Sequence, residues 1–440
     1  MALKGLDIFK LTPKTNCKDC GNPTCMAFSM KVAQGAIALD KCPHMSDDAK
    51  AQLGDATAPP MAKLTIGAGD GLALGGETVL FRHDKTFVSK NLFAVSICPD
   101  CRDEKLRSVE SIDYDRLGER MHIELLNLKY GGDTGEYLEL VKFAQDAGRT
   151  LILECSDLDA ARAALEVCAS SKPLLNGANP QNYSAMSGLA VEFGVALGVS
   201  GANLDELYDT AAAIEQLGNK NLVLDVGCVS IKDAFAGAVQ IRRAAIKGNN
   251  RTFGYPSLVN VGDLAPGDAC MQTALASVFI LKYGSIIVME DISYAQALPL
   301  FGLRQNIFTD PQKPMKVDPG IYPLNGADEN AICCTTVDFA LTYFIVSGEM
   351  ERSGRPLNLL ISDAGGYSVL TAWAAGKLSA SSIAKFFADF DIEAKIKSRT
   401  LVIPGKVAVL KGEIEEKLPG WTIIVAPNEA IELVKFLRTL

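Results

Sequence analysis

The sequence predicts an α/β protein of three parts: a small cysteine-rich N-terminal domain, a central (β/α)8 TIM barrel, and a C-terminal open, Rossmann-like α/β domain. Four cysteines gather between residues 17 and 42, ahead of the pair Pro59-Pro60. Apolar runs then alternate with helix-period stretches as far as a Pro-rich passage at 309–326, where a shorter alternation begins. These observations predict domains at 1–57, 61–322 and 325–440.

Eight strand-like runs define the predicted barrel. Most are followed by a helix-period stretch, such as residues 203–218 and 231–248. Continuous apolar strands between helices are typical of a parallel sheet covered on both faces, and eight such units match the size of a TIM barrel. The predicted strands are Phe93–Ile97, Ile123–Leu126, Leu151–Glu154, Leu174–Asn176, Phe193–Val199, Leu222–Val226, Leu258–Val261 and Ile286–Met289.

The remaining elements lie at the two ends of the barrel region. Residues 61–90 are rich in glycine with short apolar runs, which predicts a hairpin or lead-in strands. The C-terminal pattern predicts a short open α/β sheet. Its predicted strands are Leu357–Ile361, Thr400–Ile403 and Trp421–Val425, and its predicted helices are Thr336–Val346, Val369–Leu378 and Asn428–Leu437.

Composition and charge exclude several classes of function. The formal net charge is -9, with acidic and basic residues interspersed, which argues against binding to nucleic acid or to anionic membranes. No run of about 18 apolar residues is present, so no membrane span is expected. The twelve cysteines follow a start without a signal-peptide core. We therefore expect a cytoplasmic protein with reduced cysteines rather than a disulfide framework.

The N-terminal cysteines have the spacing C-x2-C-x4-C-x16-C, formed by Cys17, Cys20, Cys25 and Cys42. Three thiolates close together and a fourth from a later segment suit a [4Fe-4S] cluster, and Gly21 permits a tight turn beside the sulfurs. Structural zinc is the alternative, but it usually takes its ligands as two C-x2-C pairs. His44 is expected near the cluster or in solvent. So small a domain would depend on its cluster to fold.

The other cysteines give weaker signals. Cys98-Pro99-Asp100-Cys101 could be redox-active or bind metal, but ordinary reduced thiols are the simpler interpretation. The adjacent Cys333 and Cys334 are awkwardly placed to ligate one metal together and are expected to serve in packing. Four further cysteines lie in strand or helix patterns and are expected to be buried, namely Cys155, Cys168, Cys228 and Cys270.

Three loops follow the predicted strands of the C-terminal domain, where open α/β sheets bind ligands. They are residues 363–368, 404–406 and 426–428. The Gly365-Gly366 pair allows close approach of the backbone to a ligand, and Ser368 and Thr371 add hydroxyls. Ordinary turn glycines would look the same. Neither a G-x-G-x-x-G nor a P-loop motif is present, which disfavours dinucleotide or ATP binding.

The stretches NCKDCGNPTC…CP and SDAGGYSVLTAWAAGK, with the order of the three domains, resemble one family over essentially the whole chain. It is the large subunit of the corrinoid iron–sulfur protein, the gamma subunit of acetyl-CoA decarbonylase/synthase systems. The resemblance implies a methyl carrier whose corrinoid receives a methyl group from methyltetrahydrofolate through a methyltransferase and passes it to acetyl-CoA synthase. It also implies a heterodimer with a smaller barrel subunit that helps to enclose the corrinoid, and a reductive activator.

The resemblance implies site residues as well. Cys17, Cys20, Cys25 and Cys42 would hold the cluster. The corrinoid would contact residues of the C-terminal domain, namely Thr336, Thr342, Gly366, Tyr367, Ser368, Val369, Leu370, Thr371, Gly405, Ala426 and Pro427. No catalytic residue is implied, since such a chain carries the methyl group between enzymes rather than acting as a stand-alone enzyme.

The histidine content agrees with a base-off corrinoid, in which no protein imidazole ligates the cobalt. The three histidines are His44, His83 and His122, and none lies in the C-terminal domain. A cobalt without an axial nitrogen donor is easier to reduce, and a low-potential cluster in the same chain could restore it after accidental oxidation. The segment 55–60 (DATAPP) would then be either a tether for a mobile cluster domain or a plain spacer.

Two other functions stay open. The barrel could bind a pterin and catalyse methyl transfer itself, although acidic residues at strand ends such as Asp225 and Glu290 form no obvious catalytic set. The chain could also be a ferredoxin-like electron carrier. A radical S-adenosylmethionine enzyme is disfavoured because the C-x3-C-x2-C spacing is absent.

Overall fold

The computed structural model describes residues 5–33, 37, 39–46, 48–50, 53, 59–226, 230–310 and 314–440. Two units make up the chain: residues 1–115 with 120–308, and residues 116–119 with 309–440. Among the described residues, no helix combines the length and the apolar composition that crossing a lipid bilayer requires. Residues 55–58 of the predicted linker and Cys228 lie outside the described residues.

The N-terminal segment is a small helical unit around the cysteines. Its elements are α1 (Gly5–Lys10), α2 (Cys25–Ala33) and the short 3-10 helix η1 (Leu39–Lys41). The hydrophobic core of this unit is small, and among the described residues it consists of Ile8, Phe28, Val32, Cys42, Met45, Ala49 and Leu53. So small a core supplies little hydrophobic stabilisation, which leaves room for a bound group to contribute to folding.

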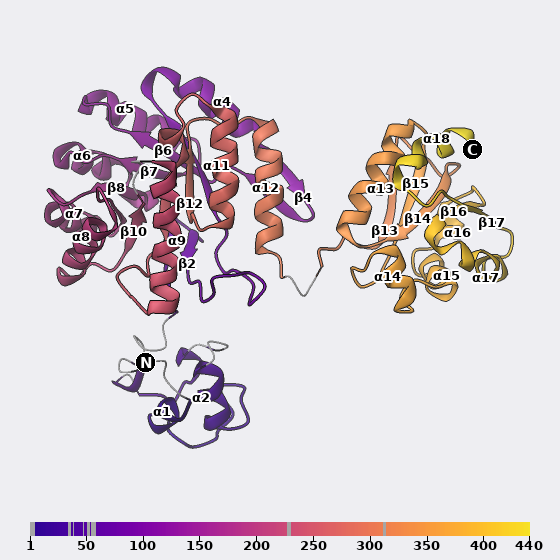
Figure 1. Ribbon diagram of the computed structural model, residues 1–440, viewed down its shortest axis with the longest axis horizontal. Helices are drawn as coiled ribbons and strands as arrows, with labels where there is room; N and C mark the ends of the chain where they lie inside the picture. Colours follow the sequence, from indigo (N-terminus) through magenta and orange to yellow (C-terminus); the bar gives the residue numbers. More distant parts are fainter. Residues whose placement is uncertain are drawn as a thin grey trace. The chain divides into compact units, whose positions relative to one another are not determined.

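The central part is a closed barrel of eight parallel strands (Figure 1). All eight predicted strands are present, some with shifted ends. Their order around the barrel follows the chain. They are β3 (Leu92–Ile97), β6 (Leu125–Lys129), β7 (Thr150–Glu154), β8 (Leu174–Ala178), β9 (Ala196–Val199), β10 (Leu222–Asp225), β11 (Ser257–Asn260) and β12 (Ile286–Met289).

Helices cover the outside of the barrel (Figure 1). Several begin where a side chain caps the first turn: Asp133, Asp157, Asn203, Ser230 and Asp268 each accept a backbone N–H three residues on. The helices are α4 (Arg102–Ser111), α5 (Thr134–Gln145), α6 (Leu158–Cys168), α7 (Tyr183–Phe193), α8 (Leu204–Gln216), α9 (Ile231–Gly248), α10 (Val261–Leu264), α11 (Ala269–Leu281) and α12 (Tyr294–Phe308).

A hairpin closes the N-terminal end of the barrel, as the glycine-rich segment predicts. Strands β1 (Lys63–Ile66) and β2 (Leu72–Gly75) pair antiparallel. Leu64, Ile66 and Leu74 pack against barrel-strand residues such as Leu125 and Ile152. A second hairpin, β4 (Asp113–Arg116) with β5 (Glu119–His122), lies between β3 and β6 in the chain. Functional side chains of the barrel are therefore expected at its other end.

The C-terminal sheet has the strand order β13-β15-β14-β16-β17, in which only β13 runs antiparallel to its neighbour. The predicted strands at β15 (Leu357–Ser362), β16 (Thr400–Ile403) and β17 (Thr422–Val425) are confirmed. The chain reverses its direction of winding between β14 and β16. In an open α/β sheet, that switch point is where ligands bind.

Two strands and several helices of this domain escaped prediction. The strands are β13 (Gly320–Leu324) and β14 (Ile332–Val337). The helix predicted over Thr336–Val346 was wrong at its start, because the apolar and β-branched run ICCTTV forms β14 and the helix begins only at Ala340. Three predicted helices are present with shifted ends, namely α13 (Ala340–Ser353), α14 (Val369–Ala374) and α18 (Leu433–Thr439). The helices that escaped prediction are α15 (Ala380–Asp389), α16 (Ile392–Lys395) and α17 (Lys411–Lys417), with the 3-10 turns η4 (Gly405–Leu410) and η5 (Ala430–Glu432).

Cysteine burial agrees with the sequence at most positions. Cys155 and Cys168 are buried in the barrel core, and Cys333 and Cys334 are buried in the cores on the two faces of the C-terminal sheet. Cys270 is a correction, because it is exposed rather than buried. It lies in the first turn of α11, whose core-facing residues begin at Gln272.

Candidate cofactor sites

The cysteine segment is a chain of tight turns that leads into α2. Asn16, Lys18 and Gly21 have positive φ angles of 51°, 70° and 74°, and the N–H of Gly21 donates to the carbonyl of Lys18 at 2.8 Å. Gly21 is free of strain in this conformation, as its predicted role requires. Helix α2 begins at Cys25, whose N–H donates to Oδ1 of Asn16 at 2.8 Å.

The four predicted ligands differ in exposure. Cys25 and Cys42 are buried, Cys20 is half-buried and Cys17 is exposed, and none forms a disulfide. The amide of Asn22 donates to the carbonyl of Cys20 at 3.0 Å and approaches its Sγ at 3.6 Å. Free thiols held in a turn, with an amide N–H donor beside Sγ of Cys20, fit an iron–sulfur cluster, since such donors tune the cluster potential.

His44 lies beside the exposed end of this segment. Its Nε2 is 2.6 Å from Oδ2 of Asp19, and both side chains are about half exposed. The hydrogen bond from His44, followed by one from Cys17, lowers the pKa of Asp19. The ligand atoms of Cys17, Asp19 and His44 lie within 4.8 Å of one another. The expectation that His44 lies near the cluster segment or in solvent agrees with this position.

A cavity of about 340 Å³ opens at the carboxyl ends of β14, β16 and β17. Its lining is mostly apolar, with contributions from α13, α14 and the turns after the strands, as is typical of pockets for large organic cofactors. Eight of the residues predicted to contact a corrinoid lie together in this lining: Thr336, Thr342, Ser368, Val369, Leu370, Gly405, Ala426 and Pro427.

One buried polar atom in the cavity has no protein partner. Thr336 is 2% exposed, and its hydroxyl makes no hydrogen bond. Leaving a buried hydroxyl unpaired costs about 1–3 kcal/mol, so such groups call for an explanation. Because Thr336 lines the cavity at the end of β14, a bound cofactor could supply the missing hydrogen bond. The residues present therefore fit a large polar-edged cofactor.

Gly405 brings two turns of the cavity wall into close contact. A Cβ at this position would lie 2.4 Å from the carbonyl oxygen of Ala426 and 2.8 Å from the carbonyl of Pro427. Real Cβ atoms do not approach backbone oxygens so closely, so any side chain would push the turns after β16 and β17 apart. The lack of a side chain at Gly405 thus sets the width of this end of the cavity.

Three predicted contact residues are not in the cavity lining. Tyr367 is exposed, and Thr371 Oγ1 lies 3.0 Å from the hydroxyl of Ser368. Gly366 has φ +76°, and a Cβ there would lie 3.2 Å from the Lys316 side chain. These residues shape and border the turn that carries Ser368 and Val369. The sequence motif thus marks a whole turn, of which only part faces the cavity.

Asp338 holds that turn in place, a role that was not predicted from the sequence. It is completely buried just after β14, and its carboxylate accepts the N–H groups of Ala364 at 2.9 Å and Gly366 at 3.0 Å. Lys316 approaches it at 3.4 Å. An acidic residue after a strand was the available signal, but its role depends on pairing between segments far apart in the sequence.

The carboxyl end of the barrel carries a separate polar cavity of about 410 Å³. Asp225 lies there and accepts a hydrogen bond from Asn176 at 3.2 Å. Glu290, the other predicted strand-end acid, is tied to the backbone N–H of Gly267 at 2.8 Å and to Gln272 at 3.0 Å. These bonds, that from Gly267 foremost, lower its pKa. The carboxylate of Glu290 thus serves as a hydrogen-bond acceptor that holds neighbouring segments in place.

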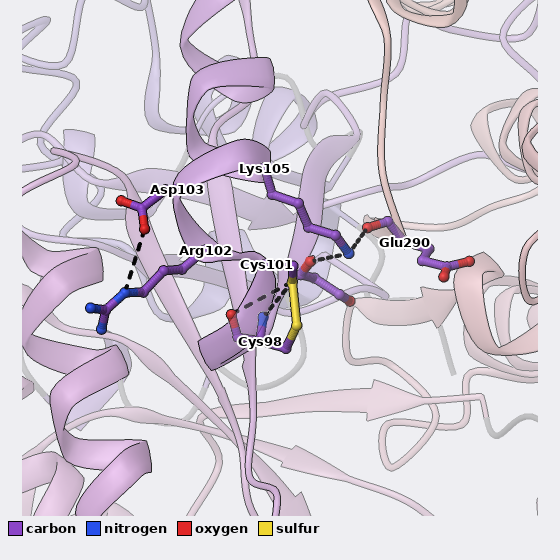
Figure 2. Close-up of a disulfide and its surroundings, with 7 residues drawn as sticks. Cys98, Cys101, Arg102, Asp103, Lys105 and Glu290 are labelled. Carbon is purple, nitrogen blue, oxygen red and sulfur yellow. Dashed lines mark hydrogen bonds and ion pairs between the residues drawn. A yellow bond between two sulfur atoms is a disulfide. The ribbon is translucent and has the colours of Figure 1, made fainter.

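Cys98 and Cys101 also lie at this end of the barrel, directly after β3. Figure 2 shows them joined by a disulfide beside Lys105, and their Cα atoms are 5.4 Å apart. The expectation of ordinary reduced thiols is therefore corrected. The reason is local: the turn η2 (Pro99–Cys101) brings residues three apart within the distance that a disulfide spans.

Comparisons with known proteins agree with the resemblance noted from the motifs. The family model of the CO dehydrogenase/acetyl-CoA synthase delta subunit matches residues 63–437, and that of a putative Fe-S cluster matches residues 13–44. The second range contains all four predicted cluster cysteines.

Full-length relatives extend the match. The corrinoid/iron-sulfur protein large subunit of Moorella thermoacetica is 39% identical over 100% of this chain and 99% of its own. The acetyl-CoA decarbonylase/synthase complex subunit gamma of Methanopyrus kandleri is 31% identical over 99% of this chain and 97% of its own. A solved dihydropteroate synthase from Thermus thermophilus covers 57% of this chain and all of its own at 17% identity, with a TM-score of 0.40, which is too weak a likeness to carry an inference. The chain therefore belongs to the CO dehydrogenase/acetyl-CoA synthase delta subunit family, alongside the corrinoid/iron-sulfur protein large subunits and the acetyl-CoA decarbonylase/synthase gamma subunits.

Proposed function

We propose that the chain is a methyl-group carrier that binds a corrinoid in the cavity at the ends of β14, β16 and β17. The observation that carries the proposal is the buried, unpartnered hydroxyl of Thr336 in the wall of that cavity. A bound corrinoid would supply a cobalt that accepts and releases a methyl group. The eight predicted contact residues in the lining support this choice of cofactor.

We further propose that the corrinoid is bound base-off. The residues of the C-terminal domain include no histidine, because the three histidines of the chain are at positions 44, 83 and 122. The cavity is lined by hydroxyl and aliphatic side chains, the sulfurs of Cys334 and Met350, the amide of Asn428, the carboxylate of Glu429 and the amine of Lys406, and its lining contains no imidazole. The protein therefore leaves the lower face of the ring without an imidazole.

A [4Fe-4S] cluster on Cys17, Cys20, Cys25 and Cys42 is the second part of the proposal. Four free cysteines in the Fe-S family match support it, as does the amide of Asn22, whose N–H is directed at Sγ of Cys20 at 3.6 Å. The chemistry supplied by such a cluster is one-electron transfer at low potential. Its role here would be to return oxidised cobalt to the state that accepts a methyl group.

Partners are proposed from the exposed side chains around the cavity. Large apolar residues of α13, α14 and the turn η5 are exposed at 40% or more, which a partner that covers the cavity would bury. They include Leu341, Ile345, Leu370, Trp373 and Ile431. We propose the small corrinoid iron–sulfur subunit as this partner, and as exchange partners a methyltetrahydrofolate methyltransferase, acetyl-CoA synthase and a reductive activator, all cytoplasmic.

The proposal is tested by anaerobic purification of the chain co-expressed with its small subunit. We expect one cobalt and about four irons per heterodimer, and a Co(II) electron paramagnetic resonance spectrum without hyperfine splitting from a histidine nitrogen. Material with iron but no cobamide would contradict the methyl-carrier function. Splitting that disappears in a histidine variant would contradict the base-off state alone.

One observation keeps a second function in view, namely pterin-dependent methyl transfer by the barrel. The cavity at its carboxyl end is lined by Asn176, Asp225 and Lys129, which could hydrogen bond to a polar heterocycle. Turnover of methyltetrahydrofolate with free cobalamin by the purified chain alone would favour this function. We expect none, because Lys129 is held in ion pairs with Glu154 at 3.5 Å and Asp263 at 3.3 Å, which retain its proton.

A further inference from the structure

The disulfide at the mouth of the barrel stands apart from every other described cysteine. Cys98 is exposed and Cys101 is half-buried, and both lie in the turn between β3 and α4. By contrast, burial raises the pKa of Cys155 to about 11 and that of Cys168 to about 12, which makes these thiols unreactive. The pair at 98 and 101 is thus accessible, as Cys17 and Cys270 are, and among the described cysteines it is the pair that forms a disulfide.

A purely structural role suits this disulfide poorly. It links residues only three apart, and the entropy that a disulfide removes from the unfolded chain grows with the length of the loop it closes. The turn is already held by the N–H of Cys101, which donates to the carbonyl of Cys98 at 3.3 Å. Helix α4 beyond it is anchored by Lys105, whose ammonium donates to the carbonyls of Ser96 and Glu290 at 2.9 and 2.6 Å (Figure 2).

The surroundings of the Cys98–Cys101 disulfide favour thiol–disulfide exchange instead. The Sγ of Cys101 accepts the backbone N–H of Cys98 at 3.2 Å. Cys101 also stands at the N-terminus of α4, a helix of ten residues, and Lys105 follows it by one turn. A helix N-terminus, a nearby cation and an N–H donor all stabilise a thiolate, so Cys101 is a good leaving group when its partner sulfur is attacked.

We propose that Cys98 and Cys101 form a redox-active dithiol–disulfide pair, with Cys98 as the sulfur that exchanges with an external dithiol. A thiolate of that dithiol attacks Sγ of Cys98, and the bond to Cys101 breaks with Cys101 leaving as a thiolate. The second thiol of the dithiol then attacks its own sulfur in the mixed disulfide and releases Cys98. The pair gains two electrons and two protons, and the external dithiol becomes a disulfide.

The site is chemically distinct from the proposed cluster, because it takes two electrons together with protons where the cluster takes one electron. It does not depend on corrinoid binding, since every group involved lies in residues 96–105 and at Glu290. Reduction would release the covalent link between the end of β3 and the start of α4 at the barrel mouth. The external reductant is a dithiol, carried either by a protein or by a small molecule.

The first test uses the intact full-length protein with its cofactors. It is equilibrated anaerobically with mixtures of reduced and oxidised dithiothreitol, alkylated without unfolding, and analysed by peptide mass spectrometry. We expect Cys98 and Cys101 to change from disulfide to alkylated thiols together, in one two-electron transition. Exposed Cys270 serves as the control for a lone thiol and should be alkylated in every mixture, whereas buried Cys155 should be protected in all of them.

The second test assigns the attacked sulfur. The oxidised protein is treated briefly with an excess of a monothiol, quenched with acid and analysed by fragmentation of the 98–101 peptide. The mixed disulfide should be found on Cys98, with Cys101 as a free thiol, in about tenfold excess over the opposite arrangement. Equal amounts, or an excess of the mixed disulfide on Cys101, would overturn the assignment of Cys98. The proposal as a whole falls if both residues are alkylated as free thiols in the most oxidising mixture, or if the disulfide persists in the most reducing one until the protein is unfolded.

Discussion

The carboxylate of Asp338 accepts the backbone N–H of Gly366 at 3.0 Å, which ties the end of β14 to the glycine turn after β15. The same carboxylate accepts the N–H of Ala364 and faces Lys316. The turn in question leads to Ser368 and Val369 in the cavity wall. A single buried acid therefore fixes the position of a turn that the sequence motif marks but does not itself hold.

Replacing this acid should loosen the turn. In Asp338→Ala, two backbone N–H groups lose their acceptor, so we expect the free energy of unfolding of the C-terminal domain to fall by about 1–3 kcal/mol and the corrinoid content to fall with it. Urea unfolding and cobalt analysis measure the two effects. Asp389→Ala removes an exposed acid of α15 and should change neither. A variant Asp338→Ala that keeps full stability would contradict the anchoring role.

The hydroxyl of Thr336 offers a test that separates binding from folding. Because it has no protein partner, Thr336→Val should leave the stability of cofactor-free protein unchanged or slightly higher, while corrinoid affinity falls about tenfold, the equivalent of one hydrogen bond at about 1.4 kcal/mol. Ser362→Ala removes another buried, unpartnered hydroxyl that is not part of the cavity lining, and should leave affinity intact. Equal affinity in wild type and Thr336→Val would remove the main support for the site.

Gly405 should tolerate no side chain. The Cβ of Gly405→Ala would collide with the carbonyl oxygen of Ala426, so the turns after β16 and β17 must separate, at a cost of about 1–3 kcal/mol. We expect lower stability and loss of corrinoid in the same variant. Gly412→Ala is the matched control, because a Cβ there meets nothing within 4 Å and lies in α17. It should be neutral or stabilising by up to about 1 kcal/mol.

The cluster proposal predicts a difference between two cysteines of opposite burial. Cys42→Ser removes a buried sulfur that belongs both to the proposed ligand set and to the small N-terminal core. We expect loss of most of the iron and of the visible charge-transfer absorption, with increased proteolysis of residues 5–53. Cys270→Ser changes an exposed thiol outside the set and should keep all of the iron. Full iron content in Cys42→Ser would rule Cys42 out as a ligand.

The sequence predicted the parts of the fold that depend on local pattern. The eight barrel strands are continuous apolar runs such as Ile286–Met289, and their burial on both faces makes them recognisable without knowledge of the fold. The cluster prediction for the four N-terminal cysteines depends on their spacing alone. The cavity residues of the 368–370 turn were predicted through a family motif rather than through physics.

What escaped prediction depends on contacts between distant segments. The sequence predicts a helix over the end of β14 because Thr336 is followed closely by helix-forming residues, and only pairing with β15 and β16 fixes this segment as the central strand. The role of Asp338 depends on a turn 28 residues later. The pairing of Cys98 with Cys101 depends on the local path of one 3-10 turn, which a C-x-x-C spacing permits but does not require.

His122, a half-buried histidine of β5, predicts how the stability of the protein depends on pH. Burial lowers the pKa of His122, so the folded protein holds this imidazole neutral where the unfolded chain, with an ordinary pKa of about 6.5, binds a proton. The unfolded state therefore binds more protons. This contribution to the free energy of unfolding is present above the unfolded pKa and is lost as the pH falls below it.

In His122→Gln, the part of the stability loss at low pH that comes from His122 should disappear. His83→Gln, which changes an exposed histidine, should keep it. Urea midpoints between pH 7.5 and 5.5, a range that brackets the ordinary histidine pKa, measure the slope. Equal slopes in wild type and His122→Gln would show that the folded protein binds this proton as readily as the unfolded chain, and that burial leaves the imidazole unperturbed.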